Sequence, residues 1–164
     1  AVMALGMIGV QASASAAEQK FGYVDLARVF DEYTKTKEFD KNLAAKGEVK
    51  TQERERMVAE VKKLRDEAEL LSAKSKEDKQ AVIDEKIKTL QEFDRTTRDE
   101  LRKERDVMVK AILAEIEAVI QNFGKSQGYT LILSDRALVY KSEGGDLTNQ
   151  VIKDLNDSYA SKKK

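Results

Sequence analysis

The sequence predicts a mostly helical α+β protein in which a long antiparallel coiled-coil hairpin is attached to a small β-sheet body. Ala, Glu, Lys, Leu and Arg make up nearly half of the 164 residues, a composition typical of long or coiled helices. The chain contains no proline, the residue that breaks helices most strongly. Strand-like segments occur only near the two ends of the mature chain, so we expect long helices to connect them.

Residues 1–17 have the character of a secretory signal peptide. Residues 1–10 form an uncharged, largely apolar run, and residues 11–17 are mostly small. This order is typical of the apolar core and cleavage region of such a signal. A membrane-spanning helix needs roughly 20 apolar residues, about twice the number present. We therefore expect a signal peptide remnant at 1–17 of an exported precursor, and no permanent anchor.

The first part of the body is expected at residues 18–36. Residues 21–25 alternate in polarity and contain aromatic and β-branched side chains, which predicts a strand. Asp25 can cap a short helix over residues 26–33, whose apolar side chains fall at helical spacing. Thr34 or Thr36 is the expected cap of the helix that follows.

The charged, proline-free sequence of residues 37–123 predicts a hairpin arm of two long helices. Gly47 is a possible flexible point in the first helix. The apolar residues of the distal half of the first helix are spaced by four, three, four and three positions, as in a coiled-coil seam. They are Met57, Val61, Leu64, Ala68 and Leu71. The seam of the second helix becomes polar in its middle, so we expect the hairpin to be loosely zipped away from its tip.

The tip of the hairpin is expected within residues 72–79, where Ser75 can cap the second helix. A reversal near residue 77 would bring apolar residues of the two helices opposite one another. The expected pairs are Leu71 with Ile83, Leu64 with Leu90 and Val61 with Phe93.

The second part of the body is expected at residues 124–160. Gly128 can end the long helix, and residues 129–134 and 137–141 are strand-like segments that we expect to pair as a hairpin. Asp146 is the expected cap of a last amphipathic helix, and residues 161–164 are expected to be a disordered tail. Such short strands leave sheet edges unpaired, so we expect several copies to associate.

The composition excludes several functional classes. The 30 basic and 30 acidic residues cancel, so the overall charge does not favour binding to nucleic acid. The absence of Cys and His removes thiol nucleophiles, imidazole bases and the usual zinc ligands. Neither a nucleophile with its base nor a phosphate-binding glycine loop is recognisable. We expect a protein that is not an enzyme and uses neither a cofactor nor ATP.

Two segments at opposite ends of the chain resemble the Skp/OmpH family of Gram-negative periplasmic chaperones. They are Gly22-Tyr23-Val24-Asp25 with Phe30, and Gly128-Tyr129 through Tyr140 followed by Asp146-Leu147-Thr148. Neither segment is a catalytic signature. Their specificity comes from their positions at the two ends of a helical hairpin of suitable length, and the resemblance extends from Gln19 to about Ser158.

The resemblance implies a periplasmic homotrimer whose three hairpins enclose a cavity, where unfolded outer-membrane β-barrel proteins are held and kept from aggregating without ATP. The residues implied for the trimer body are Val24, Leu131, Leu133 and Val139. Those implied for contact with the client are Val49, Met57, Leu101 and Met108. Each of these apolar residues could instead belong to the core of its own chain.

The chain departs from the better-known members of this family in its charge. Those members are strongly basic with positive tips, whereas here the basic and acidic residues near the tip nearly balance. This argues against contact with lipopolysaccharide or an anionic membrane. The alternative function is that of a structural or scaffolding coiled coil in the cell envelope, whose arms would be zipped along their whole length.

Overall fold

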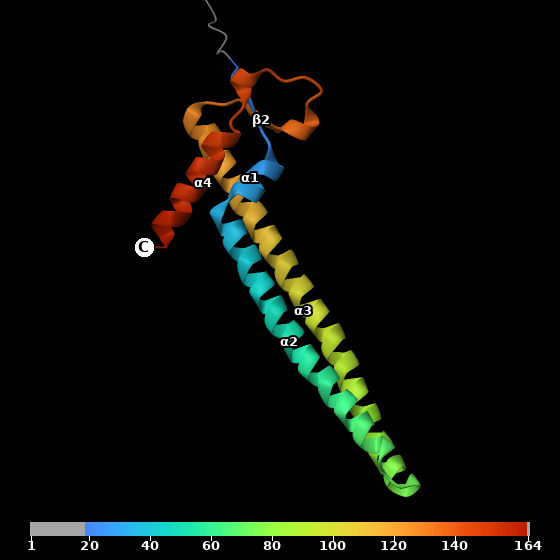
Figure 1. Ribbon diagram of the computed structural model, residues 1–164. Helices are drawn as coiled ribbons and strands as arrows, with labels where there is room; N and C mark the ends of the chain where they lie inside the picture. The colour runs from blue at the N-terminus through green and yellow to red at the C-terminus, as the bar shows by residue number, and fades with distance from the viewer. Residues whose placement is uncertain (1–18, 164) are drawn as a thin grey trace, which may run out of the picture.

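The computed structural model describes residues 19–163, which form a small body at one end of a long two-helix arm (Figure 1). The expected signal peptide at 1–17 lies outside the described residues. In chain order the elements are β1 (Phe21–Val24), α1 (Leu26–Glu32), α2 (Thr34–Glu69), α3 (Ala73–Gln127), β2 (Leu131–Ser134), two 3₁₀ turns (Asp135–Ala137 and Glu143–Gly145) and α4 (Thr148–Lys162). The predicted fold class is confirmed. No helix within residues 19–163 combines the length and the apolar character needed to cross a membrane.

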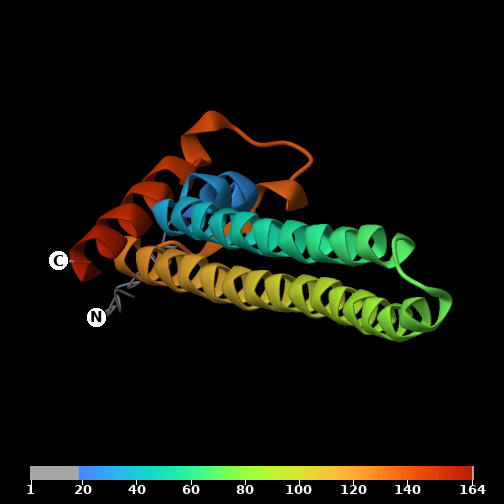
Figure 2. The same cartoon turned by 60° about the horizontal axis from the view of Figure 1, so that its bottom comes forward.

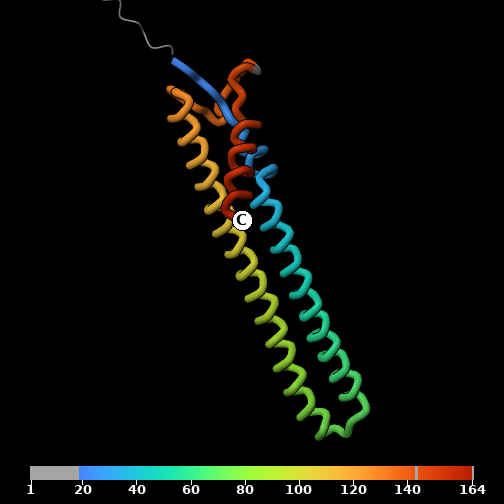
Figure 3. The backbone as a smooth tube through the Cα atoms, turned by 90° about the vertical axis from the view of Figure 1, so that its left-hand side faces the viewer, coloured from blue at the N-terminus to red at the C-terminus, as the bar shows by residue number. Residues whose placement is uncertain are grey.

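The arm consists of α2 and α3, which run antiparallel and meet at a short turn (Figure 3). The turn occupies residues 70–72, and α3 begins at Ala73, directly after Ser72. The prediction of a tip at 72–79 with Ser75 as the cap is therefore wrong. The backbone N–H groups of Leu70 and Leu71 donate to the carbonyl groups of Glu67 and Ala68, at 3.2 and 3.3 Å, and tighten the end of α2 just before the chain reverses.

The earlier reversal changes the register of the hairpin. A cluster near the tip combines residues of both helices: Val61, Ala68 and Ile83 are buried, and Leu64 and Ile87 are half-buried against them. Across the same interface Lys79 contacts Glu67 at 2.6 Å and Lys86 contacts Glu60 at 2.8 Å. The expected pairs Leu64 with Leu90 and Val61 with Phe93 are thus wrong, because each residue of α2 faces an earlier residue of α3. Leu71 is 42% exposed instead of covering Ile83.

The sheet of the body pairs β1 with β2 in parallel, with Phe21 opposite Leu131 and Val24 opposite Ser134. The expected hairpin between residues 129–134 and 137–141 does not form. A 3₁₀ turn follows β2 directly, and the chain then turns towards β1. There the Tyr23 hydroxyl donates to the Ser142 carbonyl at 3.0 Å and Lys141 lies over the Tyr23 ring at 4.9 Å, so these contacts hold the segment away from β2.

The core of the body unites β1, α1, α3 and α4. Its buried side chains are Val24, Val29, Tyr33, Ile112, Ile116, Leu147, Val151 and Leu155. As predicted, Asp25 caps α1 by accepting from the Arg28 N–H at 2.9 Å. Gly128 ends α3 with a φ of 69°, a left-handed conformation that glycine adopts at little cost. Asp146 accepts from the Thr148 N–H at 2.9 Å just before α4.

The start of α2 and the end of α4 depend on each other. α2 begins at Thr34 without a side-chain cap from its own sequence, contrary to the expected cap at Thr34 or Thr36. Asn156 of α4 instead accepts from the Thr34 N–H at 2.8 Å. α4 continues through Lys162, so residues 161 and 162 are helical and not part of the expected tail. It lies alongside the body ends of α2 and α3 (Figure 2).

Gly22 is required by the close approach of Leu147 to β1. A Cβ atom at Gly22 would lie 2.5 Å from Cδ1 of Leu147 and 3.0 Å from Cε1 of Tyr129. Leu147 is only 8% exposed, so it has little space to move away. We expect Gly22→Ala to lower the free energy of unfolding by about 1–3 kcal/mol, as overpacking of a core does. Urea denaturation followed by circular dichroism measures this change.

Gly47→Ala is the control for Gly22→Ala, because a Cβ atom at Gly47 meets nothing within 4 Å. Equal losses of stability in both variants would contradict the argument.

The last turn of α4 is attached to α2 through Glu38. This carboxylate accepts hydrogen bonds from Lys163 Nζ at 2.6 Å and from the Tyr159 hydroxyl at 2.9 Å. The bond from Lys163, and then that from Tyr159, hold the pKa of Glu38 below its ordinary value of 4.5. Because the folded chain has the lower pKa, the stabilisation is complete above pH 4.5 and is lost as the pH falls through the folded pKa.

We therefore expect acidification below about pH 4.5 to loosen the C-terminal end of α4, with Glu38→Gln reducing this part of the pH dependence. Thermal unfolding of both chains, followed by circular dichroism across this range, gives the comparison. Melting temperatures that fall by the same amount with and without the carboxylate would show that Glu38 has no such role.

Candidate binding grooves between the long helices

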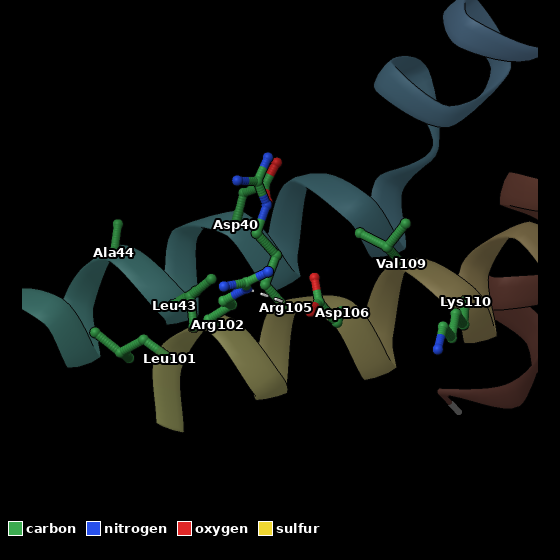
Figure 4. A pocket seen from close by; sticks show the side chains of 9 residues that line it. All are labelled: Asp40, Leu43, Ala44, Leu101, Arg102, Arg105, Asp106, Val109 and Lys110. Carbon is green, nitrogen blue, oxygen red and sulfur yellow. Dashed lines mark ion pairs between the residues drawn. The ribbon is translucent and has the colours of Figure 1, made fainter. Parts of the chain in front are cut away.

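Two open grooves lie along the interface of α2 and α3, in the half of the arm nearer the body. The first has a volume of about 950 Å³ and is drawn in Figure 4. Its apolar lining comes from both helices: Leu43 and Ala44 from α2, and Leu101 and Val109 from α3. The charged residues around them are Asp40, Arg102, Arg105, Asp106 and Lys110.

The second groove, of about 730 Å³, uses a different face of α2. Its apolar lining is Phe39, Ala45, Val49, Leu101 and Met108. Its polar lining is Asn42, Lys46, Lys50, Glu100 and Glu104. Lys46 and Glu104 form an ion pair across the helices at this groove. Leu101 lines both grooves and therefore lies between them.

The helical spacing of the sequence explains why these side chains face one another. Continued towards the body from Met57, the four-three pattern of α2 passes through Arg54, Lys50 and Gly47 and reaches Leu43. The apolar pattern is therefore interrupted by one residue without a side chain and two cations. Where large apolar residues are missing from a seam, the helices cannot fill the space between them, and grooves remain.

Three of the four residues predicted to contact a client lie in the second groove: Val49, Leu101 and Met108. Val49 is 63% exposed, whereas Leu101 and Met108 are half-buried. Met108 also packs against the body core. Met57 is half-buried nearer the tip and lines neither groove.

The sequence analysis missed several residues that line the grooves. They are Phe39, Leu43, Ala44, Ala45 and Val109. Leu43 could have been found by extending the heptad pattern across its charged interruption. Val109 could not, because its position depends on the register of the two helices.

The four residues predicted for the trimer body differ in their surroundings. Val24 is 1% exposed and packs in the core of its own chain, so it offers no surface to another copy. Leu131 is 46% exposed and Leu133 is half-buried. Val139 is fully exposed, and its neighbour Tyr140 is 86% exposed.

The grooves offer apolar contact bordered by charges of both signs. Such a surface can accept chains of varied sequence, because aliphatic and Met side chains adapt to different partners and either charge finds a counterpart on the rim. Among residues 19–163, no group of three or more His, Cys, Asp and Glu side chains is arranged to hold a metal ion.

Comparison with known proteins identifies the family. The model of the family described as outer membrane protein (OmpH-like) matches residues 20–155. No curated protein matches the sequence significantly. A crystal structure of an OmpH-like protein from Caulobacter crescentus CB15, described as a candidate outer membrane chaperone, has a similar fold, with a TM-score of 0.74. The match covers 96% of this chain and 92% of that one, at 17% sequence identity. At that identity the likeness concerns the fold, whereas the family match spans most of the sequence. The chain therefore belongs to the OmpH-like family.

Proposed function

We propose that this chain is an ATP-independent chaperone of the periplasm, which binds unfolded outer-membrane proteins between its helical arms and prevents their aggregation. The proposal rests on one observation above all: apolar side chains line open grooves along a slender arm and are not gathered in one enclosed pocket. An unfolded chain has no fixed shape, so many weak contacts distributed along an arm suit it better than one specific site. Membership of the OmpH-like family and the likeness to a candidate outer membrane chaperone support the same function.

The proposed location depends on residues 1–17. Their apolar core and small-residue cleavage region support export, and the periplasm is where unfolded outer-membrane proteins would be met. Fractionation of cells that produce the natural precursor tests this step. Recovery of the protein in the cytoplasmic fraction and not in the periplasmic one would contradict a periplasmic location.

We propose further that the active form is a homotrimer. A sheet of two strands of four residues each is marginal in water. Leu131 of β2 is exposed, and so are Val139 and Tyr140 in the segment that follows the sheet. Burial of these side chains against other copies would remove apolar surface from water and cover the edge of β2. Sedimentation equilibrium is expected to give three times the mass of one mature chain, and Val139→Asp/Tyr140→Asp is expected to reduce that mass. A single-chain mass for the unaltered protein would refute the trimer.

The chaperone activity is tested by diluting a urea-unfolded outer-membrane barrel protein into buffer and following light scattering. The mature chain in several-fold excess is expected to suppress the scattering without nucleotide. Unchanged scattering would refute the proposal. A scaffolding coiled coil, the alternative, would need arms zipped along their length, and the grooves between α2 and α3 do not favour it.

A further inference from the structure

The apolar side chains that are fully buried in the arm lie at its two ends. On α2 no residue is buried between Phe39 and Val61, and on α3 none is buried between Ile83 and Ile112. Below this stretch lies the tip cluster around Val61 and Ile83, and above it lies the core of the body. We call residues 40–60 of α2 and 88–107 of α3 the mid-arm; Ile87 still belongs to the tip cluster, and Met108 packs against the core of the body.

The seam of the mid-arm is made of residues that pack poorly. On α2 the seam positions are Leu43, Gly47, Lys50, Arg54 and Met57, and a Cβ atom at Gly47 would meet nothing within 4 Å. On α3 the half-buried seam residues Leu90 and Leu101 are separated by the polar Asp94 and Thr97, which are half-buried too. A glycine in a helix interior also loses conformational entropy on folding, so this part of α2 is intrinsically weaker.

Ion pairs replace apolar packing in the mid-arm. Arg54 contacts Asp94 at 2.9 Å, with side chains that are 50% and 32% exposed. Lys46 pairs with Glu104, with side chains 57% and 39% exposed. Ion pairs this accessible to water contribute little and are screened by salt, because the Debye length falls to about 3 Å at 1 M ionic strength. The tip has ion pairs of this kind too, Glu67 with Lys79 and Glu60 with Lys86, but there a buried apolar cluster holds the helices together as well. The mid-arm has no such cluster, so we expect its closure to be the weakest and the most sensitive to salt.

We propose that α2 and α3 separate locally in the mid-arm while the tip and the base stay closed, and that one strand-length segment of an unfolded outer-membrane protein enters the seam. The occupant rests on the proposed chaperone function, whereas the opening does not. Val61 follows Phe39 by 22 positions, which corresponds to about 33 Å of helix and to about ten residues of extended chain.

The pattern of such a segment matches the seam. A transmembrane β-strand has about 9–11 residues, in which apolar and polar side chains alternate. Its apolar side can contact Leu43, Met57 and Leu101, which are half-buried in the closed arm. Its polar side can meet Arg54 and Asp94, which form an ion pair across the two helices and lose each other as partners when the arm opens.

The opening is tested first without a client, by hydrogen exchange of the mature protein at low and high salt. Between about 0.05 M and 1 M salt we expect exchange of the mid-arm amides to become roughly three- to tenfold faster, since its ion pairs are screened. The amides of residues 61–69 and 73–83 at the tip serve as an internal control and are expected to change by less than about twofold. A uniform response, or none in the mid-arm, would overturn the opening.

The role of the opening in binding is tested by closing the seam with apolar packing. The variant replaces four polar seam residues by leucine: Lys50→Leu, Arg54→Leu, Asp94→Leu and Thr97→Leu. Apolar residues at these seam positions are expected to slow mid-arm exchange and raise the melting temperature, while affinity for the unfolded barrel protein falls at least about tenfold. The charge-reversed pair Arg54→Asp/Asp94→Arg is the matched control, and it is expected to keep both the salt response and the affinity of the unaltered chain.

The outcomes separate the two proposals. A zipped chain that is more stable yet binds as tightly as the unaltered one would overturn the seam as the binding site and leave the chaperone function standing. An unaltered chain that never suppresses scattering would refute the chaperone function, and with it the entry of an outer-membrane protein segment into the seam. The exchange experiment would still decide whether the mid-arm opens.

Discussion

Replacing Ile112 by alanine is expected to lower the free energy of unfolding by about 2–5 kcal/mol, which is the cost of removing a large aliphatic side chain from a packed core. Ile112 has an exposed fraction of 0% and lies in the cluster that joins β1, α1, α3 and α4. The cavity left by the substitution would border several elements at once, so the body cannot collapse easily to fill it. Urea denaturation followed by circular dichroism measures the loss.

The adjacent residue provides the control for this prediction. Leu113 is 39% exposed, so Leu113→Ala removes a side chain of similar size from the same turn of α3 with less loss of packing. It is expected to cost less than about 1.5 kcal/mol. Equal losses at the two positions would mean that the core of the body is not centred on Ile112.

A large functional effect is also expected from the double substitution Val49→Ser/Leu101→Ser, which removes apolar surface from the second groove. The amount of chain needed to halve the aggregation of an unfolded barrel protein is expected to rise about tenfold, corresponding to about 1.4 kcal/mol of lost apolar contact. Stability should change little, because Val49 is 63% exposed and Leu101 is only half-buried. Light scattering gives the dose dependence, and thermal unfolding checks the fold.

The matched control is Val107→Ser/Leu70→Ser. Val107 is 60% exposed, close to the value for Val49, and Leu70 is 88% exposed at the tip. Neither lines the two grooves. The control is expected to protect the client almost as well as the unaltered chain. Equal loss in both double variants would show that clients bind the arm wherever it is apolar.

The grooves were only partly predictable from the sequence. Val49 and Leu101 stand out as apolar residues at arm positions, and both lie in the second groove. Met57 was predicted with the same argument, but it lies nearer the tip, outside both grooves. The periodic pattern tells which face of each helix is apolar, whereas the residues that share a groove depend on how far one helix is shifted along the other.

What the sequence by itself determined is the part of the structure that depends on neighbours along the chain. The helical character of the arm, the cap of α1 at Asp25 and the end of α3 at Gly128 all follow from interactions within a few residues. These contacts form in the same way whatever the rest of the fold does, so local chemistry is sufficient to predict them.

The tertiary structure alone decided which distant segments meet. The position of the tip was settled by packing around Val61 and Ile83, because a four-three pattern allows several registers that all place apolar residues in the seam. The partner of β2 is β1, from the other end of the chain, and the first N–H group of α2 is bound by Asn156 of α4. Each of these pairings depends on contacts between segments far apart in the sequence, and only the folded chain brings those segments together.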